Sequence, residues 1–232
     1  MHHFPEILEA VVNSPDGISR LRQQPLVLAM RGALAAQRSD EVPVDEGLRA
    51  VHHEKGLTLA PSIRGGESTP RVPRPSECPG ELPTGWRWAR VDDTGWHVNG
   101  LAFKSQDWKP AGSPIIRIQN LTNPAAPFNY AEGPFPEDRM VEDGDILVSW
   151  SATLNAFLWD RGTAVVNQHI IKVIPDERAV TAPFLLHQLR YCVRDMAESE
   201  AAHGLVMQHV NRGPFLSFGV GSPPNRGAGS NR

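Results

Sequence analysis

The sequence has 232 residues, 40% of them hydrophobic, and a formal net charge of −3. This length allows one main globular domain with appended helical material. Because no stretch approaches the roughly 20 apolar residues of a membrane span, and because the N-terminus lacks a signal-peptide pattern, we expect a cytoplasmic protein. The slightly acidic balance is not the basic footprint that nucleic-acid binding usually leaves on a domain. Any such binding would need cations concentrated on one face, or a partner.

The sequence predicts a helical segment in the N-terminal part, residues 1–58. Apolar residues recur at roughly helical spacing at Ile18, Leu21, Leu28 and Leu34, which predicts an amphipathic helix that ends near Gly32. Pro25 predicts a kink or a new helix start inside this segment. A second, polar helix is predicted from Asp45 to Glu54. Residues 59–81 are rich in Pro, Gly, Ser, Arg and Glu, which predicts a flexible linker.

We predict that residues 82–222 form the folded domain and that residues 223–232 form a disordered tail. Short β-branched runs predict strands at 115–118, 145–150 and 165–174. A helix is predicted from Pro183 to about Glu200, with one apolar side formed by Phe184, Leu185, Leu189 and Val193. Strands followed by a helix, without βαβ alternation, predict an α+β fold with a mixed or antiparallel sheet and flanking helices.

Motifs of catalysis are missing from the sequence. It has no phosphate-binding GxxxxGK[ST], dinucleotide fingerprint, GxSxG or HExxH motif. Glu142, Asp143 and Asp145 bracket an Asp-Gly turn, which explains them better than a metal does. His52 and His53 are adjacent on a predicted helix and do not share a face. The sequence therefore predicts neither a catalytic nor a metal site.

Two blocks, Gly144–Leu154 and Asn167–Val173, resemble the core of a target recognition domain of type I restriction-modification specificity subunits. Further matches follow in the same order, at Gly17–Arg22, Arg31–Gly32, Leu82–Trp86, Arg117–Leu121, His203–Gly204 and Met207–His209. The resemblance spans almost the whole chain, to about Pro224, and corresponds to the front half of such a subunit.

The resemblance implies a non-catalytic subunit that recognises double-stranded DNA. Such subunits carry two recognition domains, each for one half of a split target, separated by long helices that dock methyltransferase subunits. It also implies that S-adenosylmethionine belongs to the methyltransferase subunits, and ATP and Mg²⁺ to a separate restriction (motor-nuclease) subunit. We therefore expect no cofactor on this chain.

Two departures from the family pattern matter. Pro25, with Gln24, falls where the family's first helix is continuous and apolar. After Pro224 the family continues into a long helix, whereas this chain ends in the polar residues 225–232. The second departure predicts a truncated product without the spacer helix and the second recognition domain.

Asn, Gln, Arg and Lys side chains match base edges, while Ser, Thr, Lys and Arg commonly bind phosphates. Loops that vary within such a family are expected to choose the target sequence, and their candidates are Lys104, Gln106, Lys109, Asn129, Tyr130 and Arg139. Arg117, Gln119 and Asn120 end a predicted strand. There a loop could present them to DNA, or Gln119 and Asn120 could satisfy loop backbone groups.

The remaining DNA-binding candidates lie in the two family blocks: Ser149, Ser151, Thr153, Gln168 and Lys172. The three hydroxyl side chains share one face if their strand continues. A motif shared by proteins that recognise different sequences cannot itself choose the sequence. For these hydroxyls, and for Gln168 with its neighbours Asn167 and His169, the sequence therefore favours hydrogen bonding within the fold.

Two alternatives remain open. The chain could dock a methyltransferase through residues 18–55 without binding DNA, as a truncated interaction module. It could also be an independent nuclease, which the missing metal site disfavours.

Overall fold

The structure is a computed structural model that describes residues 9, 11–14, 17–34, 41–42, 44–58, 73, 78, 80–151, 153–202 and 212–226. Most of the expected linker, residues 59–81, lies outside these ranges, as do the motif residues His203–Gly204 and Met207–His209. Among the described helices, none combines the length and apolarity needed to cross a bilayer.

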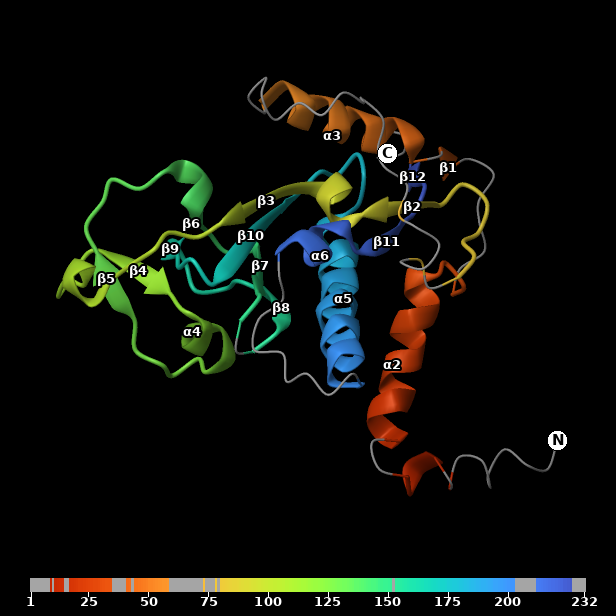
Figure 1. Ribbon diagram of the computed structural model, residues 1–232, viewed down its shortest axis with the longest axis horizontal. Coiled ribbons are helices and arrows are strands. Elements are labelled where there is room, and N and C mark those ends of the chain that lie inside the picture. The colour runs from red at the N-terminus through yellow and green to blue at the C-terminus, as the bar shows by residue number, and fades with distance from the viewer. Residues whose placement is uncertain are drawn as a thin grey trace.

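A four-stranded antiparallel sheet forms the centre of the molecule (Figure 1). Its strand order is β3 (Gly95–Asn99), β10 (Ile170–Pro175), β7 (Ile146–Ser149) and β8 (Asn155–Leu158). The long helix α5 (Ala182–Ala202) packs against β7 and β8. Its apolar side chains follow helical spacing, and Leu185, Leu189 and Val193 are at most 1% exposed. The main core therefore lies between this sheet and α5.

A second four-stranded sheet extends from the first, on the left of Figure 1. Its order is β5 (Asn129–Ala131), β4 (Ser113–Ile116), β9 (Ala164–Val166) and β6 (Met140–Val141). Strands β4 and β9 are parallel, with Ile115 opposite Val165, and the other pairs are antiparallel. Three short helical turns flank this sheet: η3 (Ser105–Asp107), α4 (Ile118–Thr122) and η4 (Glu137–Arg139).

Two small antiparallel pairs close the other end of the molecule. Strand β2 (Arg87–Arg90) pairs with β11 (Gly219–Ser222), between the short helices η2 (Val91–Thr94) and α6 (Arg212–Ser217). Strand β1 (Glu41–Val42) pairs with β12 (Asn225–Arg226). The disordered tail was expected to include residues 225 and 226, so for these two the prediction was wrong. Backbone pairing with β1 orders them without any apolar periodicity.

The predicted α+β class with a mixed or antiparallel sheet is confirmed. The predicted strands at 115–118 and 145–150 correspond to β4 and β7, with limits shifted by one or two residues. The predicted strand at 165–174 is wrong as a single element. It divides into β9 and β10, which belong to different sheets.

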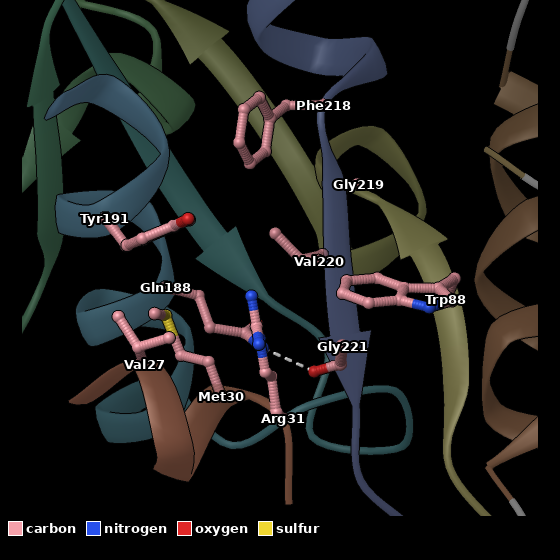
Figure 2. A pocket seen from close by; sticks show the side chains of 10 residues that line it. All are labelled: Val27, Met30, Arg31, Trp88, Gln188, Tyr191, Phe218, Gly219, Val220 and Gly221. Carbon is pink, nitrogen blue, oxygen red and sulfur yellow. Dashed lines mark hydrogen bonds between the residues drawn. The ribbon is translucent and has the colours of Figure 1, made fainter. Parts of the chain in front are cut away.

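Helix α2 (Gly17–Met30) packs on α5 along one side. It is a single helix with Pro25 inside it. It stops before Gly32, whose φ of +67° suits glycine and whose missing Cβ leaves room for the Trp86 ring, 2.8 Å from the ideal Cβ position. Val27 and Met30 face α5 and β11 across a small pocket (Figure 2). In that pocket the buried Gln188 side chain donates a hydrogen bond to the Gly221 carbonyl oxygen.

Helix α3 (Asp45–Thr58) lies across the top of the central sheet in Figure 1 and is joined to it by charged contacts. Arg178, after β10, forms a bidentate pair with the Glu54 carboxylate, at 2.9 and 3.0 Å, and also bonds to Asp176. The hydrogen bonds from Arg178 lower the pKa of both carboxyl groups. Lys55 pairs with Asp92 of η2 at 2.7 Å. Together with the buried side chains of Leu48 and Val51, which belong to the main core, these contacts hold α3 on the domain.

Beneath α3, His97 is a buried imidazole whose side chain is 1% exposed. Its ring packs edge-on against Phe215, with centroids 6.3 Å apart, and among the described residues neither ring nitrogen has a hydrogen-bond partner. Burial and the nearby charges of Lys55 and Arg212 lower the pKa of His97 to about 3. His97 is therefore neutral in the folded protein at neutral pH.

We predict that His97 makes the protein acid-labile. Below the ordinary histidine pKa of 6.5 the unfolded chain takes up a proton that the folded chain does not, so stability falls as the pH falls from 6.5 toward 3. The wild type should lose about 1.4 kcal/mol more per pH unit over that range than His97→Phe. Urea unfolding at several pH values measures this difference. Parallel pH profiles of the two proteins would contradict the assignment.

Candidate nucleic-acid interface

The chain crosses from one sheet to the other at Asn167–His169, the centre of the second family block. The Asn167 carbonyl oxygen accepts the Ile170 amide at 3.0 Å, which closes the turn between β9 and β10. The Asn167 side-chain oxygen accepts the His169 amide at 3.3 Å. Gly100 lies so close that a Cβ there would be 2.2 Å from the Asn167 carbonyl oxygen. The Asn167 side chain is thus engaged in this turn, and the residue is only 8% exposed.

The β7–β8 turn, which carries the first family block, packs beside this crossing. The Trp150 amide donates to the His169 carbonyl oxygen at 3.4 Å, and the two rings lie 6.0 Å apart. Ser149 is fully buried and its hydroxyl donates to the Thr153 carbonyl oxygen. Ser151 is 6% exposed. Of the candidates in the two blocks, only the Thr153 and Gln168 side chains are exposed.

Asn120 is an internal residue. It is 1% exposed, its side-chain oxygen accepts the Arg117 amide at 3.0 Å, and its NH₂ group donates to the carbonyl oxygens of Ala126 and Pro127. All these bonds hold α4 and the loop that follows it. Of the two interpretations left open for Asn120, the geometry matches loop support. Gln119, one residue earlier on α4, is exposed.

Arg139 and Lys172 also form contacts within the fold. Arg139 donates to the Asn99 carbonyl oxygen and lies 3.4 Å from the Asp138 carboxylate. Lys172 pairs with Asp145 at 2.9 Å and donates to the Met140 carbonyl oxygen at 2.7 Å. The Asp145 carboxylate in turn accepts the Glu142 amide at 2.9 Å, as the turn interpretation of this acidic group predicts.

The other six candidates come together at the edge of the second sheet, beside β5 and β4. One of them, Asn129, is a half-buried residue of β5. Helix η3 is closed by two bonds between Lys104 and Asp107: the Lys104 amide donates to the Asp107 carboxylate at 2.7 Å, and the Asp107 amide donates back to the Lys104 carbonyl oxygen at 2.9 Å. The Lys109 amide then donates to the Tyr130 carbonyl oxygen at 2.9 Å, which ties the loop to β5. Lys104, Gln106 and Lys109 are exposed on this anchored loop.

Arg117 and Trp108 complete this surface. The Arg117 guanidinium carbon lies 5.5 Å from the centre of the Trp108 ring, and that tryptophan is 43% exposed. We call the group formed by Lys104, Gln106, Trp108, Lys109, Arg117 and Tyr130 the η3 surface. Residues 104–117 contain three cations and one carboxylate, that of Asp107. This segment is therefore net positive on a chain whose net charge is negative.

Sequence reasoning did not single out Trp108, because tryptophans are more often core residues. The available signal was its setting: Gln106, Asp107, Lys109 and Pro110 surround it without an apolar neighbour. Trp86, Trp88 and Trp150, in contrast, are buried or half-buried.

Metal-binding geometry is not found within the described ranges, where no three His, Cys, Asp or Glu side chains gather in a way that could hold an ion.

Comparisons with known proteins agree with the resemblance in the sequence. No family model matches the chain. It is 30% identical over 122 residues to the type I restriction enzyme EcoAI specificity subunit of Escherichia coli, a match that covers 51% of this chain and 20% of that protein. It is 29% identical over 172 residues to the EcoEI specificity subunit of Escherichia coli, covering 65% of this chain and 27% of that protein. The chain thus spans about a quarter of the length of these relatives.

A solved structure has the same fold. That structure concerns the structural basis underlying complex assembly and conformational transition of the type I R-M system. The match has a TM-score of 0.50 at 15% sequence identity and covers 96% of this chain and 47% of that one. Sequence and fold together identify the chain as a homologue of type I restriction enzyme specificity subunits, over the part of their length that it spans.

Proposed function

We propose that this chain recognises one half of a split DNA target and positions methyltransferase subunits on it, as the DNA-specificity component of a type I restriction-modification complex. The observation that carries the proposal is the η3 surface, in a chain related to specificity subunits. It gathers cations and amide and aromatic side chains on one anchored sheet edge, which are the groups that bind phosphates and base edges.

Duplex DNA fits this surface because its cations are available for contact. Lys104 and Lys109 are exposed, and within the described chain neither these two nor Arg117 forms an ion pair. Arg139 and Lys172, in contrast, are engaged with carboxylates and carbonyl oxygens. We therefore assign DNA contact to Lys104, Gln106, Lys109, Arg117 and Tyr130, with Gln119 beside them, and a supporting role to the buried candidates.

Methyltransferase docking fits helix α2. Ile18, Leu21 and Leu28 lie three and seven residues apart, so they share one side of the helix, and they are 49%, 40% and 42% exposed. The opposite side already packs on the core through Val27 and Met30. A helix that is apolar on two sides needs a second partner. The exposed side of α2 formed by Ile18, Leu21 and Leu28, which we call the stripe, also favours the alternative function, a module that docks a methyltransferase without binding DNA.

We predict that Lys109→Glu weakens binding to duplex DNA about ten-fold at low salt and reduces the slope of log affinity against log salt by about 1, because a phosphate contact is lost. Gel-shift titrations over a series of salt concentrations measure both. Arg49→Glu is the matched control, because it makes the same charge change at an exposed position. Arg49 belongs to α3, which lies away from the η3 surface in Figure 1. Equal losses in the two variants would contradict a local interface, and no binding by the wild type would favour the interaction module.

We predict that Leu28→Glu weakens association with the methyltransferase subunit of the same restriction-modification system about ten-fold or more, because it places a charge in a desolvated contact. Leu26→Glu is the control, since Leu26 is also exposed, at 38%, but points away from Leu28. Analytical ultracentrifugation of the mixed proteins gives both dissociation constants. If the two variants bind equally well, the stripe is not the docking side.

We further propose that the chain itself carries no reactive centre, and that S-adenosylmethionine, ATP and Mg²⁺ act on the partner subunits. Purified chain incubated with duplex DNA and all three should leave the DNA unmethylated and uncut. The readouts are transfer of a labelled methyl group and gel analysis of the duplex. Divalent-ion-dependent cleavage that copurifies with the chain would instead support the nuclease alternative.

A further inference from the structure

Trp108 is an exposed indole on an anchored turn. It follows η3, and its amide donates to the Ser105 carbonyl oxygen at 3.3 Å. The residue before it is bonded to Lys104, and the residue after it is bonded to Tyr130 of β5. The backbone on both sides of the ring is thus fixed, while 43% of the side chain remains exposed. The fold holds this ring in place without burying it.

Arg117 restrains the ring from a different element. It follows β4, and its guanidinium lies over the indole, 5.5 Å from the ring centre. A cation over an aromatic face is attracted by the ring quadrupole. Tryptophan and arginine thereby hold each other in a preformed arrangement. Little conformational entropy would therefore be lost when either one contacts a ligand.

Trp108 differs from the tryptophans that form the core. Other tryptophans of the chain contribute to the core, such as Trp86 at 9% and Trp159 at 2% exposure. Trp108 is not among the buried and partly buried residues that form the two large core clusters. An exposed aromatic ring with a restrained neighbour, among cations, has the properties of a contact residue.

Resting on the function proposed above, we propose that Trp108 and Arg117 act as one contact unit in the DNA groove. The exposed part of the indole packs against a base step, while the guanidinium that holds the ring contacts the adjacent phosphate. Apolar side chains that press on base steps favour the steps that unstack most readily. The pair would then contribute to sequence preference, whereas Lys104 and Lys109 contribute affinity that does not depend on sequence.

Photo-crosslinking tests the contact directly. The probe is a pool of random-sequence duplexes with bromodeoxyuridine in place of thymidine, irradiated with the full chain, after which peptide mapping locates the crosslinked residue. We expect crosslinks at Trp108. We also expect Trp108→Ala to bind the pool about ten-fold more weakly with an unchanged salt slope, and Trp108→Phe to lose less. Leu158→Ala is the control, because it removes an apolar side chain that is 52% exposed on β8.

The outcomes separate the two proposals. If the wild type binds and Lys109→Glu weakens binding, but Trp108 is not crosslinked and Trp108→Ala binds normally, this inference is overturned and the proposed function stands. If the wild type binds no duplex at all, both are overturned. A loss in Trp108→Ala together with a lower melting temperature, while Trp108→Phe behaves as Trp108→Ala does, would indicate a structural role and overturn the inference.

Discussion

The structure depends on the turn at Asn167–His169, where the chain leaves one sheet and enters the other. The Asn167 carbonyl and side-chain oxygens close this turn, and the missing side chain of Gly100 lets a neighbouring segment approach it. The Trp150 amide joins it to the β7–β8 turn. The two sheets also share a buried core cluster, in which Ile116 and Val166 of the second sheet pack with Leu147 and Ile170 of the central sheet. The two sheets are therefore held as one scaffold, with the η3 surface at the far edge.

Under the proposed function, this arrangement separates support from recognition. The two family blocks form the junction itself, with Ser149 buried and Asn167 nearly so. Side chains engaged in this way cannot contact a base edge without breaking their bonds in the fold. The part of the η3 surface on residues 104–109 is tied down by backbone bonds and by the Asp107 carboxylate, so its exposed side chains can change without disturbing the junction. Such a division would suit the proposed function, because the target sequence could change while the scaffold stays the same.

The sequence predicted the elements that have a strong local signal. Helix α5 and strand β7 are regular apolar patterns with clear starts, and both are confirmed. The division of residues 165–174 could not be predicted, since apolar runs on both sides of Asn167 look like one strand, and only pairing with distant partners separates them. The role of Asn120 depends on the path of residues 126 and 127, which no local pattern encodes. Trp108 was missed because an expectation about its residue type outweighed its polar neighbours.

The net negative charge of the chain is compatible with a cationic surface at one end. Net charge is a property of the whole sequence, whereas a phosphate responds mainly to charges within about one Debye length, roughly 8–10 Å in physiological salt. Many of the carboxylates are engaged away from the η3 surface, such as Glu54 and Asp176 with Arg178 under α3. Figure 1 shows the second sheet and helix α2 at opposite ends of the molecule. Under the proposed function, DNA at one end and a protein partner at the other would therefore not compete for the same surface.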